Sequence, residues 1–138
     1  MDNQDNKAEL VFVDLPMGRM FKPLEYAVTG DLVQEFMETV GDRHPLYRNT
    51  LAPPGLAVIY ARLSYLQDHT MPSGGVLARQ EFEFHKPVEV GDTLRVKARV
   101  VESNLDEKER KRVTFLIEAR NQKDEAISTI RLYAIWPK

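Results

Sequence analysis

The feature that most constrains the fold of this chain is a nearly uncharged stretch directly behind two prolines. Proline has a fixed φ and no N–H group, so Pro53 and Pro54 suit the entrance of a helix but not its interior. Arg62 is the only charged residue from 55 to 66. In a helix over 55–67, apolar side chains cover more than one face: Leu56, Ile59, Tyr60, Leu63 and Leu66. A helix that is apolar nearly all round is normally buried, so we expect this one inside the fold.

The second half of the chain reads as strands, which can supply the surface that covers such a helix. Four segments have the apolar and polar alternation of strands: 76–86, 94–100, 112–120 and 126–136. Both faces of the last segment carry apolar residues, which predicts an inner strand. Short turns between these segments (90–93, 103–111 and 121–125) predict an antiparallel meander. The mixed-charge run 106–112 is expected at a solvated hairpin tip.

A second, amphipathic helix is predicted earlier in the chain. Thr29 is a suitable N-cap, and Gly41 is a natural stop after Val40. Leu32, Phe36 and Val40 recur at helical spacing, with Val33 and Met37 beside them, and together they predict one apolar stripe.

The N-terminal part of the chain has weaker signals. Residues 1–8 are polar, and we expect them to be loosely held. Residues 10–14 suggest a short extra strand, and alternation over 24–28 predicts another.

Length and composition exclude several classes of protein. A chain of 138 residues has the length of a single domain. Its net charge of −2 does not favour a nucleic-acid partner. The absence of cysteine excludes disulfides, and three scattered histidines do not predict a metal site. No apolar run approaches the roughly 20 residues that span a bilayer, and the start is unlike a signal peptide. We expect a cytoplasmic protein without a metal or other cofactor.

Two stretches resemble the MaoC-like family of hot-dog hydratases and dehydratases. The segment 84–94, FHKPVEVGDTL, is similar to the family's element F-x-x-P-V-x-x-G-D-x-L. The segment 42–47, DRHPLY, is similar to the family's loop D-x-N-P-x-H, which is followed by a helix entrance like that at 51–55. The resemblance covers roughly residues 20–136. It implies an α+β hot-dog fold, in which an antiparallel sheet wraps around a central helix, and a dimer of such domains.

The resemblance also implies a chemistry and a set of site residues. In the family, the Asp and His of the loop act on the water that is added to an enoyl thioester or removed from a 3-hydroxyacyl thioester. Here Asp42 keeps the Asp position, whereas His44 stands at the Asn position and Tyr47 at the His position. Tyrosine has an ordinary pKa of about 10 and is a poor base near neutral pH. Tyr47 therefore resembles the non-catalytic half of some paired hot-dog dehydratases.

Each of these three residues also has a structural interpretation. The Asp42 carboxylate can cap a loop by accepting backbone N–H bonds, or it can act on water. His44 can be simply exposed, or it can form a carboxylate–imidazole pair with Asp42. The Tyr47 ring can pack against the sheet, or its hydroxyl can donate a hydrogen bond to substrate.

The helix entrance is the other candidate part of the site. Backbone N–H groups at a helix N-terminus can polarise a thioester carbonyl, and the nearest donors after the prolines are Gly55 and Leu56. Gly55 can instead serve close packing against the sheet. The basic residues of the strands form a solvated face or grip the diphosphate of coenzyme A: Arg79, Arg95, Lys97 and Arg99.

Three functions are compatible with these observations. The first is a hydratase or dehydratase that acts on acyl thioesters of coenzyme A or of an acyl carrier protein. The second is a non-catalytic hot-dog subunit that shapes the acyl tunnel of a partner, in a homodimer or heterodimer. The third is a thioesterase, because fold alone does not determine function.

Overall fold

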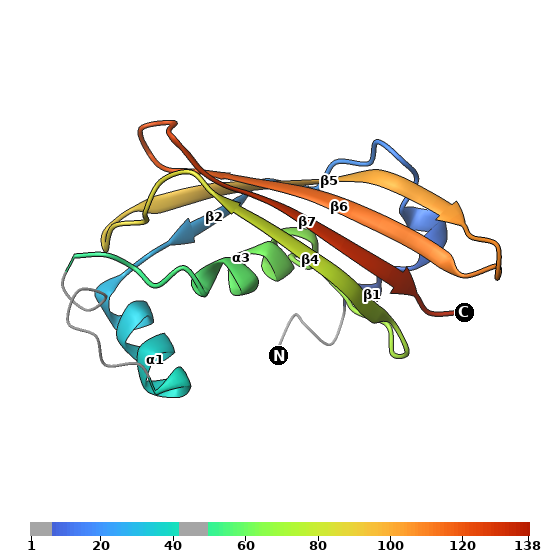
Figure 1. The fold of residues 1–138 in the computed structure, drawn as a ribbon, viewed down its shortest axis with the longest axis horizontal. Coiled ribbons are helices and arrows are strands. Elements are labelled where there is room, and N and C mark those ends of the chain that lie inside the picture. The colour runs from blue at the N-terminus through green and yellow to red at the C-terminus, as the bar shows by residue number, and fades with distance from the viewer. Residues whose placement is uncertain (1–6, 42–49) are drawn as a thin grey trace.

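A five-stranded antiparallel sheet curves over one helix in the computed structural model, which describes residues 7–41 and 50–138 (Figure 1). The strand order is β2-β5-β6-β7-β4. Its strands are β2 (Leu24–Ala27), β5 (Thr93–Leu105), β6 (Lys111–Arg120), β7 (Ala126–Trp136) and β4 (Val76–Phe84). The α+β hot-dog architecture expected from the resemblance is therefore confirmed.

The inner helix α3 (Leu56–Tyr65) lies on the concave side of the sheet, as expected (Figure 1). The face toward the sheet is buried, and Tyr60 and Ala61 are at most 2% exposed. The expectation of burial all round is wrong, because Val58, Ile59 and Leu63 are 53%, 39% and 41% exposed. The sheet covers only one side of α3, so an apolar face of the helix stays open in the single chain.

The four C-terminal strands lie where alternation predicts them, but their order differs from a simple meander. β5, β6 and β7 pair in sequence, whereas β4 pairs with β7 at the opposite edge and not with β5. The segment 85–92 therefore crosses the end of the sheet instead of forming a hairpin. The prediction that 126–136 is an inner strand is confirmed, since β7 lies between β6 and β4.

Helix α1 (Gly30–Val40) begins and ends as predicted. The Thr29 hydroxyl accepts the Leu32 N–H at 3.1 Å, and Gly41 closes the helix in the left-handed conformation with φ 76°. The predicted apolar stripe is divided between two surroundings. Val33 and Met37 are the buried residues of α1. Leu32, Phe36 and Val40 face a groove shared with α3, and Val40 is 56% exposed.

The N-terminal segment is held more firmly than its polarity suggests. Strand β1 (Ala8–Glu9) pairs in parallel with β3 (His69–Thr70), so residue 8 is part of the fold. The strand predicted at 10–14 is wrong, because the 3₁₀ helix η2 (Phe12–Asp14) occupies it. Leu10 is fully buried, and its carbonyl accepts the Trp136 indole N–H at 2.7 Å. This bond anchors the segment to the end of β7.

Candidate functional site

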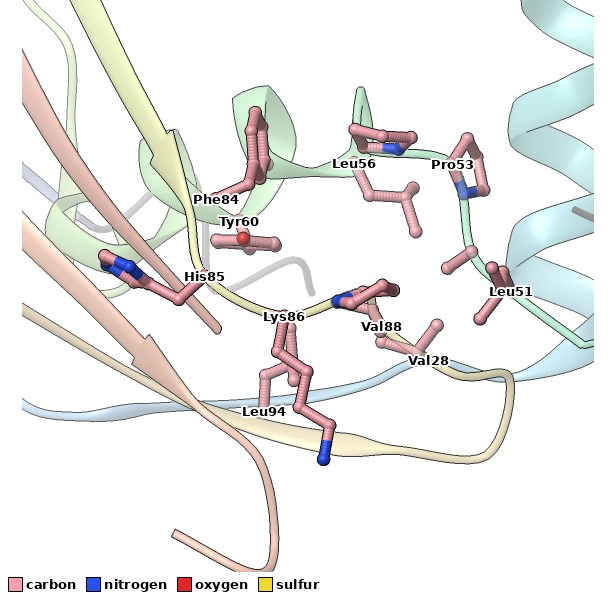
Figure 2. Close-up of a pocket in the computed structure, with 14 residues that line it drawn as sticks. Val28, Leu51, Pro53, Leu56, Tyr60, Phe84, His85, Lys86, Val88 and Leu94 are labelled. Atoms are coloured by element: carbon pink, nitrogen blue, oxygen red, sulfur yellow. The ribbon is translucent and has the colours of Figure 1, made fainter. Parts of the chain in front are cut away.

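An apolar cavity of about 380 Å³ lies between the entrance of α3 and the chain that follows β4 (Figure 2). The helix side contributes Pro53, Pro54, Leu56, Ala57 and Tyr60. The opposite side is formed by Phe84–Val88, together with Val28 and Leu94. Ligand pockets of this size and apolar character hold hydrocarbon better than charged groups. A fatty acyl chain is the kind of ligand that this lining can take.

Backbone pairing between two loops holds the helix entrance beside the cavity. The Ala52 N–H donates to the Val88 carbonyl at 2.7 Å, and the Val90 N–H donates to the Thr50 carbonyl at 3.0 Å. Leu51 forms an isolated antiparallel bridge with Glu89. The two prolines that follow then direct the chain into α3. The backbone hydrogen bonds between the two loops therefore hold the two walls of the cavity together, and the restricted conformation of Pro53 and Pro54 sets the direction of the helix entrance.

Tyr60 closes the inner side of the cavity. Its side chain is 2% exposed, and its hydroxyl lies 2.7 Å from the Ser128 hydroxyl of β7. Burial raises the pKa of Tyr60 above its ordinary value of 10. This hydroxyl is therefore protonated near neutral pH and engaged with Ser128, and it serves as a fixed wall and not as a base.

The polar side chains of the opposite wall point away from the cavity. Figure 2 shows the His85 and Lys86 side chains directed outward, while Leu56 and Val28 project into the space. The His85 Nε2 atom lies 2.9 Å from the Thr129 hydroxyl. Lys86 pairs with Glu125, and this hydrogen bond raises the pKa of Lys86. Both residues contribute their backbone to the wall, which keeps the lining apolar.

Gly55 and Leu56 occupy different places relative to the cavity. Leu56 lines it and is 3% exposed, and its N–H donates to the Pro53 carbonyl at 3.2 Å. Gly55 is exposed at the helix entrance and lies under the ring of Phe36, where an added Cβ would be 2.9 Å from Cζ. Glycine thus allows a close contact with α1, not with the sheet. Among the described residues, no backbone carbonyl accepts the Gly55 N–H.

The predicted catalytic residues Asp42, His44 and Tyr47 lie outside the described residues. The described chain ends before them at Gly41, directly after α1. It resumes at Thr50, one residue before Leu51 in the cavity wall.

Sequence reasoning missed the wall opposite the helix. In the sequence, the element 84–94 supports the fold more than the function, yet residues 84–88 line the cavity. Pro87 was the available signal, because proline interrupts strand pairing and marks where the chain leaves the sheet. The described residues contain no group of three His, Asp or Glu side chains that could hold a metal ion. None of the helices in the described ranges has the length and apolar character to span a membrane.

Comparison with protein families gives a match that covers most of the chain. The model of the "FAS1-like, dehydratase domain region" matches residues 16–130. A curated relative, a UPF0336 protein of Saccharopolyspora erythraea, is 31% identical over an alignment of 97 residues. The similarity covers 57% of this chain and 62% of the relative. The chain therefore matches less than two thirds of that relative's length.

Several solved structures, among them a hydratase and a dehydratase complex, have the same fold. An Archaeoglobus monoamine oxidase regulatory protein gives a TM-score of 0.78 at 22% identity, covering 96% of this chain and 97% of the other. The R-hydratase PhaJ1 of Pseudomonas aeruginosa has a TM-score of 0.74 at 21% identity, and the match covers 94% of this chain and 87% of PhaJ1. The HadBC 3R-hydroxyacyl-ACP dehydratase complex of Mycobacterium tuberculosis has a TM-score of 0.70 at 22% identity, and the match covers 86% of this chain and 96% of the other. These similarities show a shared hot-dog fold.

Proposed function

Because the chain belongs to the family of FAS1-like dehydratase domain regions, we propose that it catalyses reversible hydration of an acyl thioester. The substrate pair is a trans-2-enoyl thioester and the corresponding 3-hydroxyacyl thioester, on coenzyme A or an acyl carrier protein. The observation that carries this proposal is the apolar cavity that begins at the entrance of α3. It offers a binding space for an acyl chain beside backbone N–H groups at a helix N-terminus.

The helix entrance would hold the thioester carbonyl. The Gly55 N–H has no backbone acceptor within the described residues, and the helix dipole adds positive potential at this end. Hydration places negative charge on the carbonyl oxygen as water attacks C3, so a donor at this position stabilises the transition state more than the substrate. Leu56 would contribute mainly its side chain, since its N–H already bonds to Pro53.

Asp42 would act on the water molecule. In the hydration direction its carboxylate accepts a proton from water as the water oxygen bonds to C3. The electron pair of the double bond moves toward the carbonyl, and C2 then receives a proton. The proton that Asp42 took from water returns to C2, either directly or through His44 or Tyr47, which would give its own proton to C2 and regain one from Asp42. Either residue could instead assist only as a hydrogen-bond donor. Dehydration is the same sequence in reverse.

A second candidate function is a subunit that shapes the acyl tunnel for a catalytic partner. Tyr47 at the His position supports it, because an unperturbed tyrosine is a poor base. Two structures with this fold are described as complexes, HadBC and ChsH1-ChsH2 of Mycobacterium tuberculosis. Strand β4 ends the sheet order and offers an edge where a second hot-dog domain, like or unlike, can pair.

The direct test is to incubate the purified chain with trans-2-enoyl-CoA and with the same acyl group on a carrier protein. Loss of the conjugated double bond's ultraviolet absorbance, without release of free thiol, is the expected result. Thiol release would instead indicate a thioesterase and would overturn the proposal. If neither reaction occurs, purification from the native host with identification of co-purifying chains tests the subunit function. A catalytic hot-dog partner that restores hydration on mixing would support it.

A further inference from the structure

Two apolar cavities of nearly equal size meet at Leu56. The first is the candidate site of about 380 Å³, and the second, of about 390 Å³, lies between α1 and α3. Among the described residues that line the first cavity, only Leu56 also lines the second. Leu56 is therefore the described residue where the two cavities adjoin, and its side chain projects into the first one (Figure 2).

We propose that Leu56 determines the length of acyl chain that the protein accepts. In this inference, which rests on the proposed function, short chains fill the first cavity and Leu56 blocks their extension. Without that side chain, the first cavity opens into the groove between the helices, and a longer alkyl chain can continue there. The ligand in both spaces is the same hydrocarbon chain.

The lining of the groove suits an alkyl chain. Its walls include Leu32, Phe36 and Val40 of α1, together with Ile59 and Leu63 of α3. The polar side chains among its described lining residues, Glu35, Thr39 and Tyr26, come from α1 and β2. Val40 and Leu63 remain 56% and 41% exposed in this chain. A hollowed, exposed apolar surface of this kind is typical of a binding site.

The position of Leu56 makes it an effective limit. It is the first residue of α3, directly after the Gly55 N–H that is proposed to hold the carbonyl, so its side chain meets the acyl chain close to the reacting atoms. It is 3% exposed, and its backbone is fixed by the bond to Pro53. A buried side chain on a fixed backbone has little freedom to yield to a ligand.

The experiment compares kcat/KM for butenoyl-CoA and decenoyl-CoA in the wild type and four variants. Leu56→Ala should raise the decenoyl-to-butenoyl ratio at least about tenfold, the low end of discrimination by single methylene groups in a pocket. Val58→Ala is the matched control, since Val58 lies on the same helix, is 53% exposed and lines neither cavity. Its ratio should equal that of the wild type. Adding Leu63→Trp to Leu56→Ala should block the groove and return the ratio toward wild type.

Unfolding is a possible effect of removing a buried leucine, so Leu56→Val is included as a milder truncation and each variant is checked by circular dichroism. An unchanged ratio in a folded Leu56→Ala or Leu56→Val protein would overturn the inference while leaving the proposed function intact. If the wild type turns over neither substrate alone, calorimetric dissociation constants for butyryl-CoA and decanoyl-CoA replace the rates. The inference then fails if the Leu56 variants do not shift that ratio toward the longer chain.

Discussion

The hydroxyl groups of Tyr60 and Ser128 lie 2.7 Å apart in the core and join helix α3 to strand β7. Both side chains are at most 2% exposed. The bond connects positions 68 residues apart in the sequence and fixes the helix on the concave face of the sheet. It also orients the Tyr60 ring as the inner wall of the candidate site.

Tyr60→Phe should lower the free energy of unfolding by about 1–3 kcal/mol, because it leaves the buried Ser128 hydroxyl without this partner. Adding Ser128→Ala should restore part of the loss, since removing both polar groups leaves neither unsatisfied. Urea denaturation of the two single variants and the double variant measures this coupling. Strict additivity of the two losses would show that the hydrogen bond contributes nothing.

The hairpin tip between β5 and β6 depends on Asp106. Desolvation alone would raise the pKa of this carboxyl, but hydrogen bonds outweigh it and hold the pKa well below its usual range. The donors are the backbone N–H groups of Arg110 and Lys108 and the side chains of Arg110 and Arg112. Because the pKa of the carboxyl is lower in the folded protein than in the unfolded one, the ionised carboxylate stabilises the fold at pH values above its unfolded pKa of about 3.9. This stabilisation is lost as the pH falls through the pKa of the folded state.

Asp106→Asn should therefore destabilise the protein at pH 7 and weaken the loss of stability on acidification. Denaturation curves at neutral and acidic pH measure both effects. Glu107→Gln is a suitable control, because Glu107 is exposed and adjacent. Equal acid sensitivity in wild type and Asp106→Asn would contradict the assigned role.

Gly55 and Phe36 should be energetically coupled. An alanine Cβ at 55 would lie 2.9 Å from the Phe36 Cζ atom, so the ring must move. Gly55 itself has φ −59° and ψ −19°, a conformation that alanine adopts readily. Gly55→Ala should thus destabilise the wild type but be neutral or stabilising in a Phe36→Leu background, with a coupling of about 0.5–3 kcal/mol. A double-mutant cycle by denaturation measures it, and a coupling near zero would contradict the contact.

Strand β4 should carry the contact with a second hot-dog domain. It ends the sheet order, and Val76 and Leu77 near its start are 56% and 48% exposed. Replacing both with lysine places charges at this edge and should convert a dimer into monomers, as measured by light scattering after gel filtration. Val13→Lys is the control for a general effect of added charge, because Val13 is 82% exposed and lies in η2, not in β4. An unchanged dimer in the β4 variant would exclude this edge.

The sequence was most informative where one local pattern determines the structure. The near absence of charge over 55–66 predicts an inner helix, and the alternation in the strands predicts their positions. Thr29 and Gly41 mark the ends of α1 because capping depends on neighbouring residues. Such signals need no knowledge of the rest of the chain.

Relationships between distant residues could not be predicted in this way. Alternation identifies β4 as a strand but does not say that its partner is β7. Val33 and Met37 are as apolar as Leu32 and Phe36, so only the packing of α1 decides which pair is buried. The Tyr60–Ser128 bond and the shared position of Leu56 between two cavities likewise arise from tertiary structure.

We propose that this chain directs water to an enoyl thioester through Asp42. The most direct measurement is the hydration rate of trans-2-enoyl-CoA by the wild type and by Asp42→Asn, with folding checked by circular dichroism. We predict hydration by the wild type, alone or with its hot-dog partner, and a loss of at least about 100-fold in the folded variant, the lower range for a positioned proton-transfer group. Equal rates in the two proteins would contradict the account.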